Sequence, residues 1–221
     1  MYDTEELPET VVIYRCGAGE GDYDKILEEV EDIRASCRQN RPGYHPKIVM
    51  ISALRHSHIR VYPKEIPKDK RSSVQNVRSG TCIDSMTPSV PGFEEFILCS
   101  QIPLMGTSRP TKYVIIVNEA NWSKNEILNV TYHLAFGHQV CYQQTSLPSV
   151  LYAAKNLSKR GHNNYKTYNH LGEINRVTDR LTAKHSDVVT EADKKELSDT
   201  QIGRMDLKAD TCTMTRRVYW A

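Results

Sequence analysis

A glycine-rich turn near the start of the sequence is the first segment whose residue types could hold a ligand. The turn, residues 17–21, follows a β-branched run at 10–15 that predicts a buried strand. Dinucleotide-binding turns have the spacing GxGxxG and need an acidic residue at the end of the following strand. Here the glycines alternate, the next predicted strand at 47–52 has no such acid, and Glu20 and Asp22 would repel a pyrophosphate. The sequence therefore argues against a dinucleotide site.

The six cysteines could supply a metal site or a nucleophile, but their spacing favours neither. They stand at positions 16, 37, 82, 99, 141 and 212, without a CxxC pair and without zinc-finger spacing to histidine. No motif of a phosphate-binding loop, a zinc protease or a serine hydrolase occurs either. No histidine or asparagine is visibly arranged to activate Cys16. We therefore expect reduced thiols that are mostly buried, Cys16 included.

A third candidate is the basic stretch from 55 to 78. It holds seven Lys or Arg residues and two acidic residues, a net charge of +5, together with proline and serine. Such a loop can follow a phosphate backbone, and it can equally be a solvated loop without a ligand. Charge alone does not decide between these two interpretations.

Apolar patterns predict the elements that must position these residues. Strands are expected at 10–15, 47–52, 81–83, 95–100 and 113–117, with a further short strand at 59–62 inside a long loop. Helices are expected over 23–39 after an Asp22 cap, from a Ser123 cap to about 137, and over 149–160. If the first two strands pair in one sheet, their strand–helix–strand order predicts a parallel pair with a right-handed crossover.

Six short segments occur along the chain in one order. They read VIYRCG (12–17), GTCID (80–84), FILCS (96–100), GTSRP (106–110), VTYHL (130–134) and SLP (146–148). Together they resemble the PIWI domain of Argonaute proteins, whose pattern runs YRDG, GT-hydrophobic-hydrophobic-D, FYLCS, GTSRP, LTYxL and S-[IV]-P and ends in an aromatic-Ala tail. Residues 219–221 match that tail, and 135–140 and 159–161 are most similar to the worm-specific Argonaute branch.

The resemblance implies the fold and the domain organisation. It predicts an α/β fold, an RNase H-like mixed sheet flanked by helices, in which the N-terminal strands of the fold are missing. Residues 1–221 would be one partial PIWI domain with a motif-bearing core at about 10–168. Residues 184–210 are charged and poor in apolar residues, so we expect a flexible insertion there, followed by a C-terminal tail at 212–221 that docks back.

The same resemblance implies that the chain is not an enzyme. Slicing Argonautes hold two Mg²⁺ ions with Asp, Glu, Asp and Asp or His, and Mg²⁺ prefers such hard oxygen ligands. The first two ligands belong to family segments upstream of YRDG, before this sequence starts. Cys16 stands at the third position and Lys155 at the fourth. A neutral thiol is a poor Mg²⁺ ligand and an ammonium cannot ligate, so we expect no metal, no other cofactor and no cleavage.

Residues that hold the guide RNA in the family are better represented. The resemblance implies guide-phosphate contacts, each with a structural alternative. The matching residues are Arg160, Tyr152, Ser146 and His138, and the basic pair after the second strand adds Arg55 and His56. Without RNA, Arg160 would be a surface arginine and Tyr152 a core aromatic residue. Ser146 would then be a turn hydroxyl and His138 a helix-end histidine. An arginine can contact a phosphate with two charge-assisted hydrogen bonds.

The partners implied are a small guide RNA and a target RNA. Two alternatives stay open: a protein-interaction module for Trp-containing scaffold peptides, and a truncated product without a function of its own. With 39% hydrophobic and 25% charged residues and a formal charge of +2, the 221-residue chain has the composition of a globular protein. It has no apolar run of about 18 residues and no signal peptide, so we expect no membrane association and a cytoplasmic or nuclear location.

Overall fold

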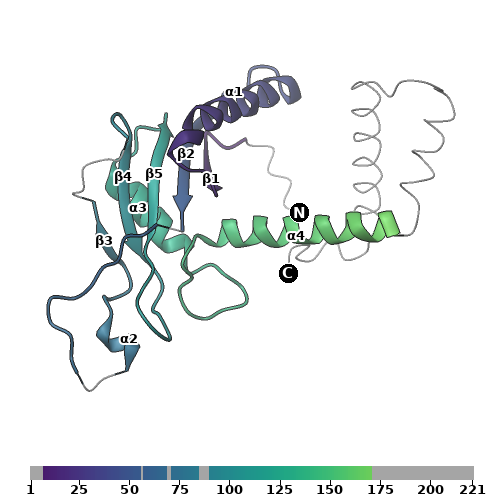
Figure 1. Cartoon of the computed structure of the whole chain (residues 1–221). Helices are drawn as coiled ribbons and strands as arrows, with labels where there is room; N and C mark the ends of the chain where they lie inside the picture. The colour runs from purple at the N-terminus through teal and green to yellow at the C-terminus, as the bar shows by residue number, and fades with distance from the viewer. Residues whose placement is uncertain (1–6, 56, 69–70, 85–89, 171–221) are drawn as a thin grey trace. The chain divides into compact units, whose positions relative to one another are not determined.

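A mixed sheet forms the centre of the computed structural model, which describes residues 7–55, 57–68, 71–84 and 90–170 (Figure 1). Within these residues the sheet has five strands in the order β1-β2-β5-β4-β3. The strands are β1 (Thr10–Cys16), β2 (Lys47–Leu54), β3 (Thr81–Ile83), β4 (Glu94–Cys99) and β5 (Thr111–Asn118). The helices are η1 (Glu20–Asp22), α1 (Tyr23–Asn40), α2 (Ser72–Gln75), α3 (Lys124–Leu134) and α4 (Ser149–His170). The predicted insertion at 184–210 and tail at 212–221 lie outside the described residues.

The predicted parallel pair is confirmed. β1 pairs with β2 in parallel, in a register that runs from Thr10 opposite Lys47 to Cys16 opposite Ala53. The remaining pairs, β2 with β5, β5 with β4 and β4 with β3, are antiparallel. A parallel pair needs a crossover connection, which α1 supplies, whereas antiparallel neighbours can be joined by loops at one end of the sheet.

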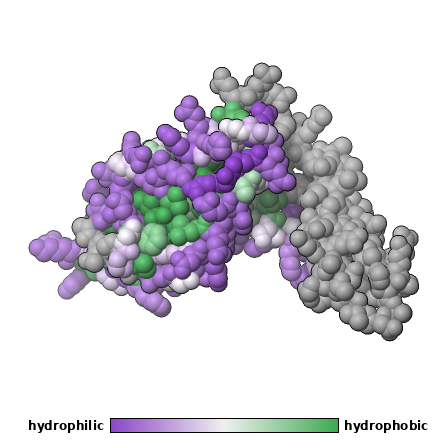
Figure 2. Space-filling view, turned by 90° about the horizontal axis from the view of Figure 1, so that it is seen from above, coloured by the Kyte–Doolittle hydropathy of each residue, from purple (hydrophilic) through white to green (hydrophobic). Residues whose placement is uncertain are grey.

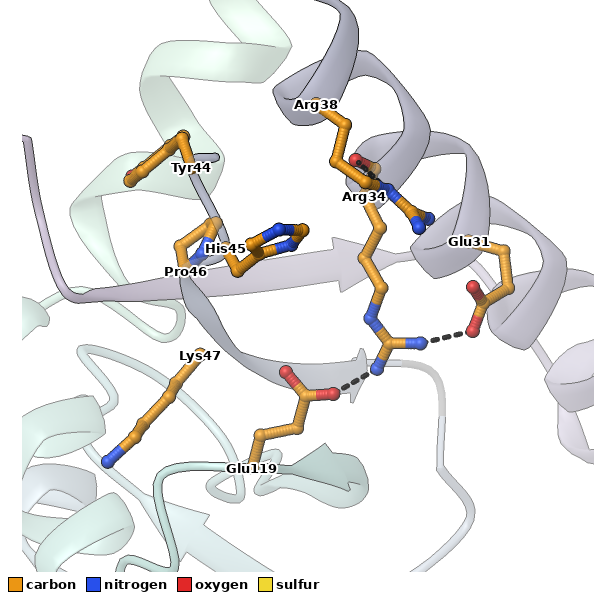
Figure 3. Close-up of a pocket in the computed structure, with 8 residues that line it drawn as sticks. All are labelled: Glu31, Arg34, Arg38, Tyr44, His45, Pro46, Lys47 and Glu119. Carbon is orange, nitrogen blue, oxygen red and sulfur yellow. Dashed lines mark hydrogen bonds and ion pairs between the residues drawn. The ribbon is translucent and has the colours of Figure 1, made fainter. Parts of the chain in front are cut away.

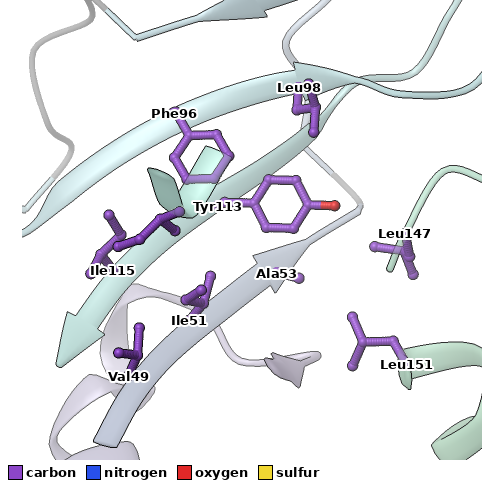
Figure 4. Close-up of a cluster of buried hydrophobic side chains, with 10 residues drawn as sticks. Val49, Ile51, Ala53, Phe96, Leu98, Tyr113, Ile115, Leu147 and Leu151 are labelled. Atoms are coloured by element: carbon purple, nitrogen blue, oxygen red, sulfur yellow. The ribbon is translucent and has the colours of Figure 1, made fainter. Parts of the chain in front are cut away.

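Each face of the sheet carries its own hydrophobic core. On one face, Tyr23, Ile26 and Val30 of α1 pack with residues of β2 and β5. On the other face, Ile127 of α3 and Leu151 of α4 join a cluster whose other buried members are Val49, Ile51, Ala53, Phe96, Leu98, Tyr113, Ile115 and Leu147 (Figure 4). Phe96 and Tyr113 stack there with ring centroids 5.1 Å apart. In the face drawn in Figure 2, hydrophilic side chains surround a central hydrophobic patch.

Two predicted features are wrong in detail. Residues 59–62 form no strand and belong to the long connection between β2 and β3. Asp22 is the residue before α1, but its side chain does not cap the helix. Instead its carboxylate accepts the Gly19 amide at 3.1 Å and lies 3.2 Å from the Lys25 ammonium, so it closes the glycine-rich turn.

Helix α4 is longer than the predicted 149–160, because its polar final turns continue to His170. A first compact unit of the chain comprises residues 1–152, and a second begins at Ala153 within α4. In the described part of the chain, no helix has the length and apolarity needed to cross a membrane.

Candidate nucleic-acid interface

Three of the predicted guide-contact residues meet in the first unit of the chain. The Ser146 and Tyr152 hydroxyls lie 2.9 Å apart, within hydrogen-bond distance. The His138 ring stacks on the Tyr152 ring at a centroid distance of 4.8 Å and an interplanar angle of 27°. Ser146 is buried, whereas His138 and Tyr152 are half-buried. We call these three residues the hydroxyl–imidazole cluster; it presents O–H and ring N–H groups of the kind that donate to phosphate oxygens.

A network of buried hydroxyls holds the loop that carries Ser146. The Thr111 hydroxyl on β5 donates to the Ser146 carbonyl at 2.9 Å, and the Ser100 hydroxyl after β4 donates to the Thr145 carbonyl at 2.7 Å. The Thr145 hydroxyl reaches the carbonyls of Ala135 and Leu147 at 2.9 and 2.8 Å. The loop between α3 and α4 is therefore fixed to the sheet by specific bonds. Sequence reasoning missed Thr111 and Thr145, because a buried threonine has no signature in one sequence.

The six motif segments also contact one another. The Tyr14 hydroxyl of the VIYRCG segment lies 2.9 Å from the Thr131 hydroxyl of VTYHL. Burial is the main cause that raises the pKa of Tyr14, so this phenol stays protonated. Gly80 of GTCID has a φ of +86° and faces the Tyr132 ring. The motifs thus include residues that pack the strands against α3 as well as Ser146 of the hydroxyl–imidazole cluster.

Cys16, at the end of β1, is exposed, so the expectation of a buried thiol there is wrong. Its position explains this: β1 leaves the sheet at Cys16 and the chain turns at Gly17, which has a φ of +82°. Nearby Tyr113 is no candidate ligand for a metal ion, since burial strongly raises the pKa of its hydroxyl. No three His, Cys, Asp or Glu side chains of the described segments are grouped so that they could hold an ion. A thiol and neutral phenols do not fit Mg²⁺.

The remaining predicted residues follow β2 in the sequence or belong to α4. Arg55 follows the last residue of β2 and is exposed. His56 lies outside the described residues. Lys155 and Arg160 belong to α4 in the second unit, where Lys155 is exposed and Arg160 is half-buried, eight residues after Tyr152 along the same helix.

A pocket of about 640 Å³ lies at the opposite end of β2 (Figure 3). It is lined by Glu31, Arg34, Arg38, Tyr44, His45, Pro46, Lys47 and Glu119. The Arg34 guanidinium pairs with both Glu31 and Glu119, and the second oxygen of Glu119 accepts the Ile48 amide at 2.7 Å. Both carboxylates are thereby engaged, and Arg38 Nε donates to the Arg34 carbonyl at 3.3 Å. The His45 ring points toward Arg34, whereas the Lys47 side chain points away (Figure 3). The sequence reasoning did not identify this pocket, because its lining comes from three separate segments.

The arrangement of strands and helices is that of an RNase H-like Argonaute lobe. The C-terminal lobe of a budding yeast Argonaute has a TM-score of 0.64 at 22% identity, covering 70% of this chain and 33% of that one. A Kluyveromyces polysporus Argonaute with a guide RNA has a TM-score of 0.64 at 22% identity, covering 70% of this chain and 19% of that one. At such identities the likeness defines the fold, and it confirms the predicted RNase H-like class.

The sequence itself matches the Piwi domain family over residues 2–166, and the chain belongs to that family. It is 49% identical over 216 residues to the Nuclear RNAi defective-3 protein of Caenorhabditis elegans, covering 97% of this chain and 20% of that protein. It is 30% identical over 158 residues to Protein argonaute 11 of rice, covering 70% of this chain and 18% of that protein. The higher identity to the worm protein confirms the predicted branch, and the chain spans about a fifth of these relatives.

Proposed function

We propose that this chain is a non-slicing PIWI module that binds the 5′ phosphate and adjacent backbone of a small guide RNA in RNA-directed gene silencing. The guide would select a target RNA by base pairing, while the protein contacts phosphates without reading sequence. We infer also that residues 1–221 form part of one PIWI domain. The name of the worm relative favours the nucleus over the cytoplasm, a choice that imaging of the tagged chain would decide.

The observation that carries this proposal is the hydroxyl–imidazole cluster. Ser146 and Tyr152 share one hydrogen bond at 2.9 Å, so one hydroxyl proton of the pair remains available to a ligand. The stacked His138 ring can add a ring N–H, and a hydrogen bond to a charged group contributes roughly 1.5–3 kcal/mol. For Arg160, in the second unit, we propose a phosphate contact from the family resemblance and from the chemistry of the guanidinium alone.

The absence of slicing rests on the chemistry of Cys16 and Lys155. Two-metal cleavage needs hard anionic oxygens that hold both ions close to the scissile phosphate. A thiol at one ligand position and an ammonium at another cannot do this. The chain would therefore bind RNA and leave the cutting of targets to other proteins.

Binding of two matched RNAs tests the proposal. We expect the full chain to bind a 5′-phosphorylated RNA at least tenfold more tightly than the same RNA with a 5′-hydroxyl, because each charge-assisted hydrogen bond to the phosphate contributes about 1.5–3 kcal/mol. Ser146→Ala, Tyr152→Phe and Arg160→Ala should each reduce this preference. Tyr165→Phe, an exposed tyrosine on the same helix, is the matched control and should leave it unchanged. Equal affinity for both RNAs would reject 5′-phosphate binding.

A second candidate function is the binding of Trp-containing peptides. The pocket at the start of β2 favours it, because the Tyr44 and His45 rings, Pro46 and the Arg38 guanidinium provide flat and cationic surfaces for an indole (Figure 3). A Trp-rich peptide should bind without RNA, and Tyr44→Ala should weaken it, whereas Tyr62→Ala on an exposed loop should not. A chain that binds neither RNA nor peptide would support the remaining alternative, a product without a function of its own.

A further inference from the structure

The long connection between β2 and β3 carries an excess of positive charge over its described residues. From position 57 on, these residues, 57–68 and 71–80, contain one acidic side chain, Glu65. The cations of this part are Arg60, Lys64, Lys68, Arg71 and Arg78. Among the described residues, none of these five side chains lies within ion-pair distance of a carboxylate. Cations gathered on one loop without carboxylate partners create a positive local potential, which attracts an anionic ligand.

This connection has a defined shape. The Arg60 guanidinium donates to the carbonyls of Ser57 and Ile59 at 2.9 and 2.8 Å, which folds the first part of the loop on itself. The Gln75 side chain on α2 donates to the Pro67 carbonyl at 2.7 Å, which ties the middle of the loop to its end. These hydrogen bonds within the connection hold the backbone that carries the cations.

The neighbouring loop between β4 and β5 supports the connection from one side. The Asn76 amide donates to the Gly106 carbonyl at 2.9 Å, and its side-chain oxygen accepts the Ser108 amide at 2.7 Å. Both loops leave the same end of the sheet, where β2 and β4 end and β3 and β5 begin (Figure 1). This doubly bonded asparagine makes the two loops one platform.

The platform is linked to the hydroxyl–imidazole cluster by a short chain of hydrogen bonds. The Ser79 hydroxyl donates to the Ser100 carbonyl, and the Ser100 hydroxyl donates in turn to the Thr145 carbonyl at 2.7 Å. Thr145 precedes Ser146 of the cluster. A strand held by its 5′ end at the cluster could therefore continue across the platform.

We propose that residues 57–68 and 71–78 form a second RNA contact, separate from the 5′-phosphate site, in which Lys64, Lys68 and Arg71 bind backbone phosphates. Tyr62, 60% exposed, lies two residues before Lys64 and provides a ring on which a base can stack. Cations interleaved with an exposed aromatic ring suit a single strand, which offers both phosphates and unstacked bases. The contact extends the proposed guide binding and rests on it.

The test is a salt titration of RNA binding by the full chain. We expect the triple variant Lys64→Ala, Lys68→Ala, Arg71→Ala to lower the slope of log K against log salt by about 2, since each single-strand phosphate contact contributes roughly 0.7. This fall in slope should appear with a 5′-phosphorylated RNA of about twenty nucleotides. It should be small with a 5′-phosphorylated RNA of about four nucleotides, because so short an RNA fills only the 5′ site. Tyr62→Ala should weaken binding without changing the slope. Thermal unfolding confirms that each variant is folded.

The matched control removes three exposed cations that lie in neither this connection nor the pocket at the start of β2: Lys25→Ala, Arg41→Ala, Lys166→Ala. An equal fall in slope with this control would overturn the second contact, because charge removed anywhere would then suffice. An unchanged slope in the loop variant, with the 5′-phosphate preference kept, would reject the second contact and leave the proposed function intact. The reverse result would support the loop and reject the 5′ site. Polyglutamate that competes as well as RNA would identify an acidic-protein surface instead.

Discussion

At the scale of single residues, the hydroxyl pair of Ser146 and Tyr152 should also contribute to stability. Ser146 is buried, so its hydroxyl would lose its partner if Tyr152 were changed to Phe. We expect each of Ser146→Ala and Tyr152→Phe to destabilise the fold by about 1 kcal/mol, and the double variant to cost less than the sum. Urea unfolding of the four proteins measures this coupling. Strictly additive losses would show that the two hydroxyls do not interact.

The thiols should differ in reactivity according to their burial. Burial, followed by the nearby Asp84 carboxylate, raises the pKa of Cys82 to about 11, and burial also raises the pKa of Cys99. Because the thiolate is the reactive form, neither should be alkylated in the folded protein at about pH 8. Exposed Cys16 and Cys141 should react first. Mass spectrometry after brief iodoacetamide treatment tests the order, and fast labelling of Cys82 would contradict it.

The family resemblance named the three residues of the cluster but not their environment. The SLP segment and the following tyrosine could be predicted to come together, because six or seven residues at a helix start stay close in space. The exposure of Cys16 could not, since it depends on where β1 leaves the sheet. Nor could the buried ion pair of Lys112 with Glu95, 3.0 Å apart, because it depends on the register of β4 against β5.

At the scale of elements, Gly80 fixes the contact between the start of β3 and α3. Its φ of +86° is unfavourable for other residues, and an added Cβ would lie 3.1 Å from the Tyr132 ring and hydroxyl. We expect Gly80→Ala to cost about 2–4 kcal/mol from backbone strain and overpacking together. Gly92→Ala is the control for strain alone, because Gly92 has a φ of +93° and no neighbour within 4 Å of an added Cβ. Equal losses in thermal or urea unfolding would refute the contact with Tyr132.

The capping box of α3 should make stability depend on pH. The Ser123 amide and hydroxyl donate to the Glu126 carboxylate at 2.7 and 2.8 Å, and these bonds hold the pKa of Glu126 below its ordinary value. A folded-state pKa below the unfolded one means that the carboxylate stabilises the fold above the unfolded pKa, and that this stability is lost as pH falls through the folded one. Glu126→Gln should therefore lower the melting temperature at neutral pH, and the difference from the unchanged protein should disappear in acid. A difference in melting temperature that does not vary with pH would show that the Glu126 carboxylate is not its cause.

Elements with strong periodicity were predictable and short or irregular ones were not. Val12, Val49 and Ile115 belong to β-branched runs whose burial decides their structure, and Ser123 caps α3 as its capping-box spacing indicates. The β-branched residues Ile59 and Val61 suggested a strand, but no neighbouring strand pairs with them in the described sheet. Pairing is a tertiary property that a run of four residues does not contain.

At the scale of the whole molecule, the two faces of the sheet carry different sets of residues. The face covered by α3 and the start of α4 carries Tyr14, Tyr113 and Tyr152 with the motif segments. The face covered by α1 carries the second hydrophobic core, and Lys112 anchors η1 through Glu20 at 3.3 Å. The family resemblance predicted this RNase H-like arrangement of sheet and helices. It did not predict the pocket, because the pocket forms only where α1 and the start of β2 come together in the folded chain.

The proposed absence of slicing belongs to this scale too, because a two-metal site needs ligands from several segments at once. We expect Cys16→Asp to produce no saturable Mn²⁺ binding in calorimetry and no cleavage of a guide-paired target, since one carboxylate at position 16 and a lysine at position 155 still give an incomplete set of oxygen ligands. The unchanged chain is the control and should also be inert. Metal-dependent cleavage by either protein would show that other oxygens complete the site, and the non-slicing function would then be wrong.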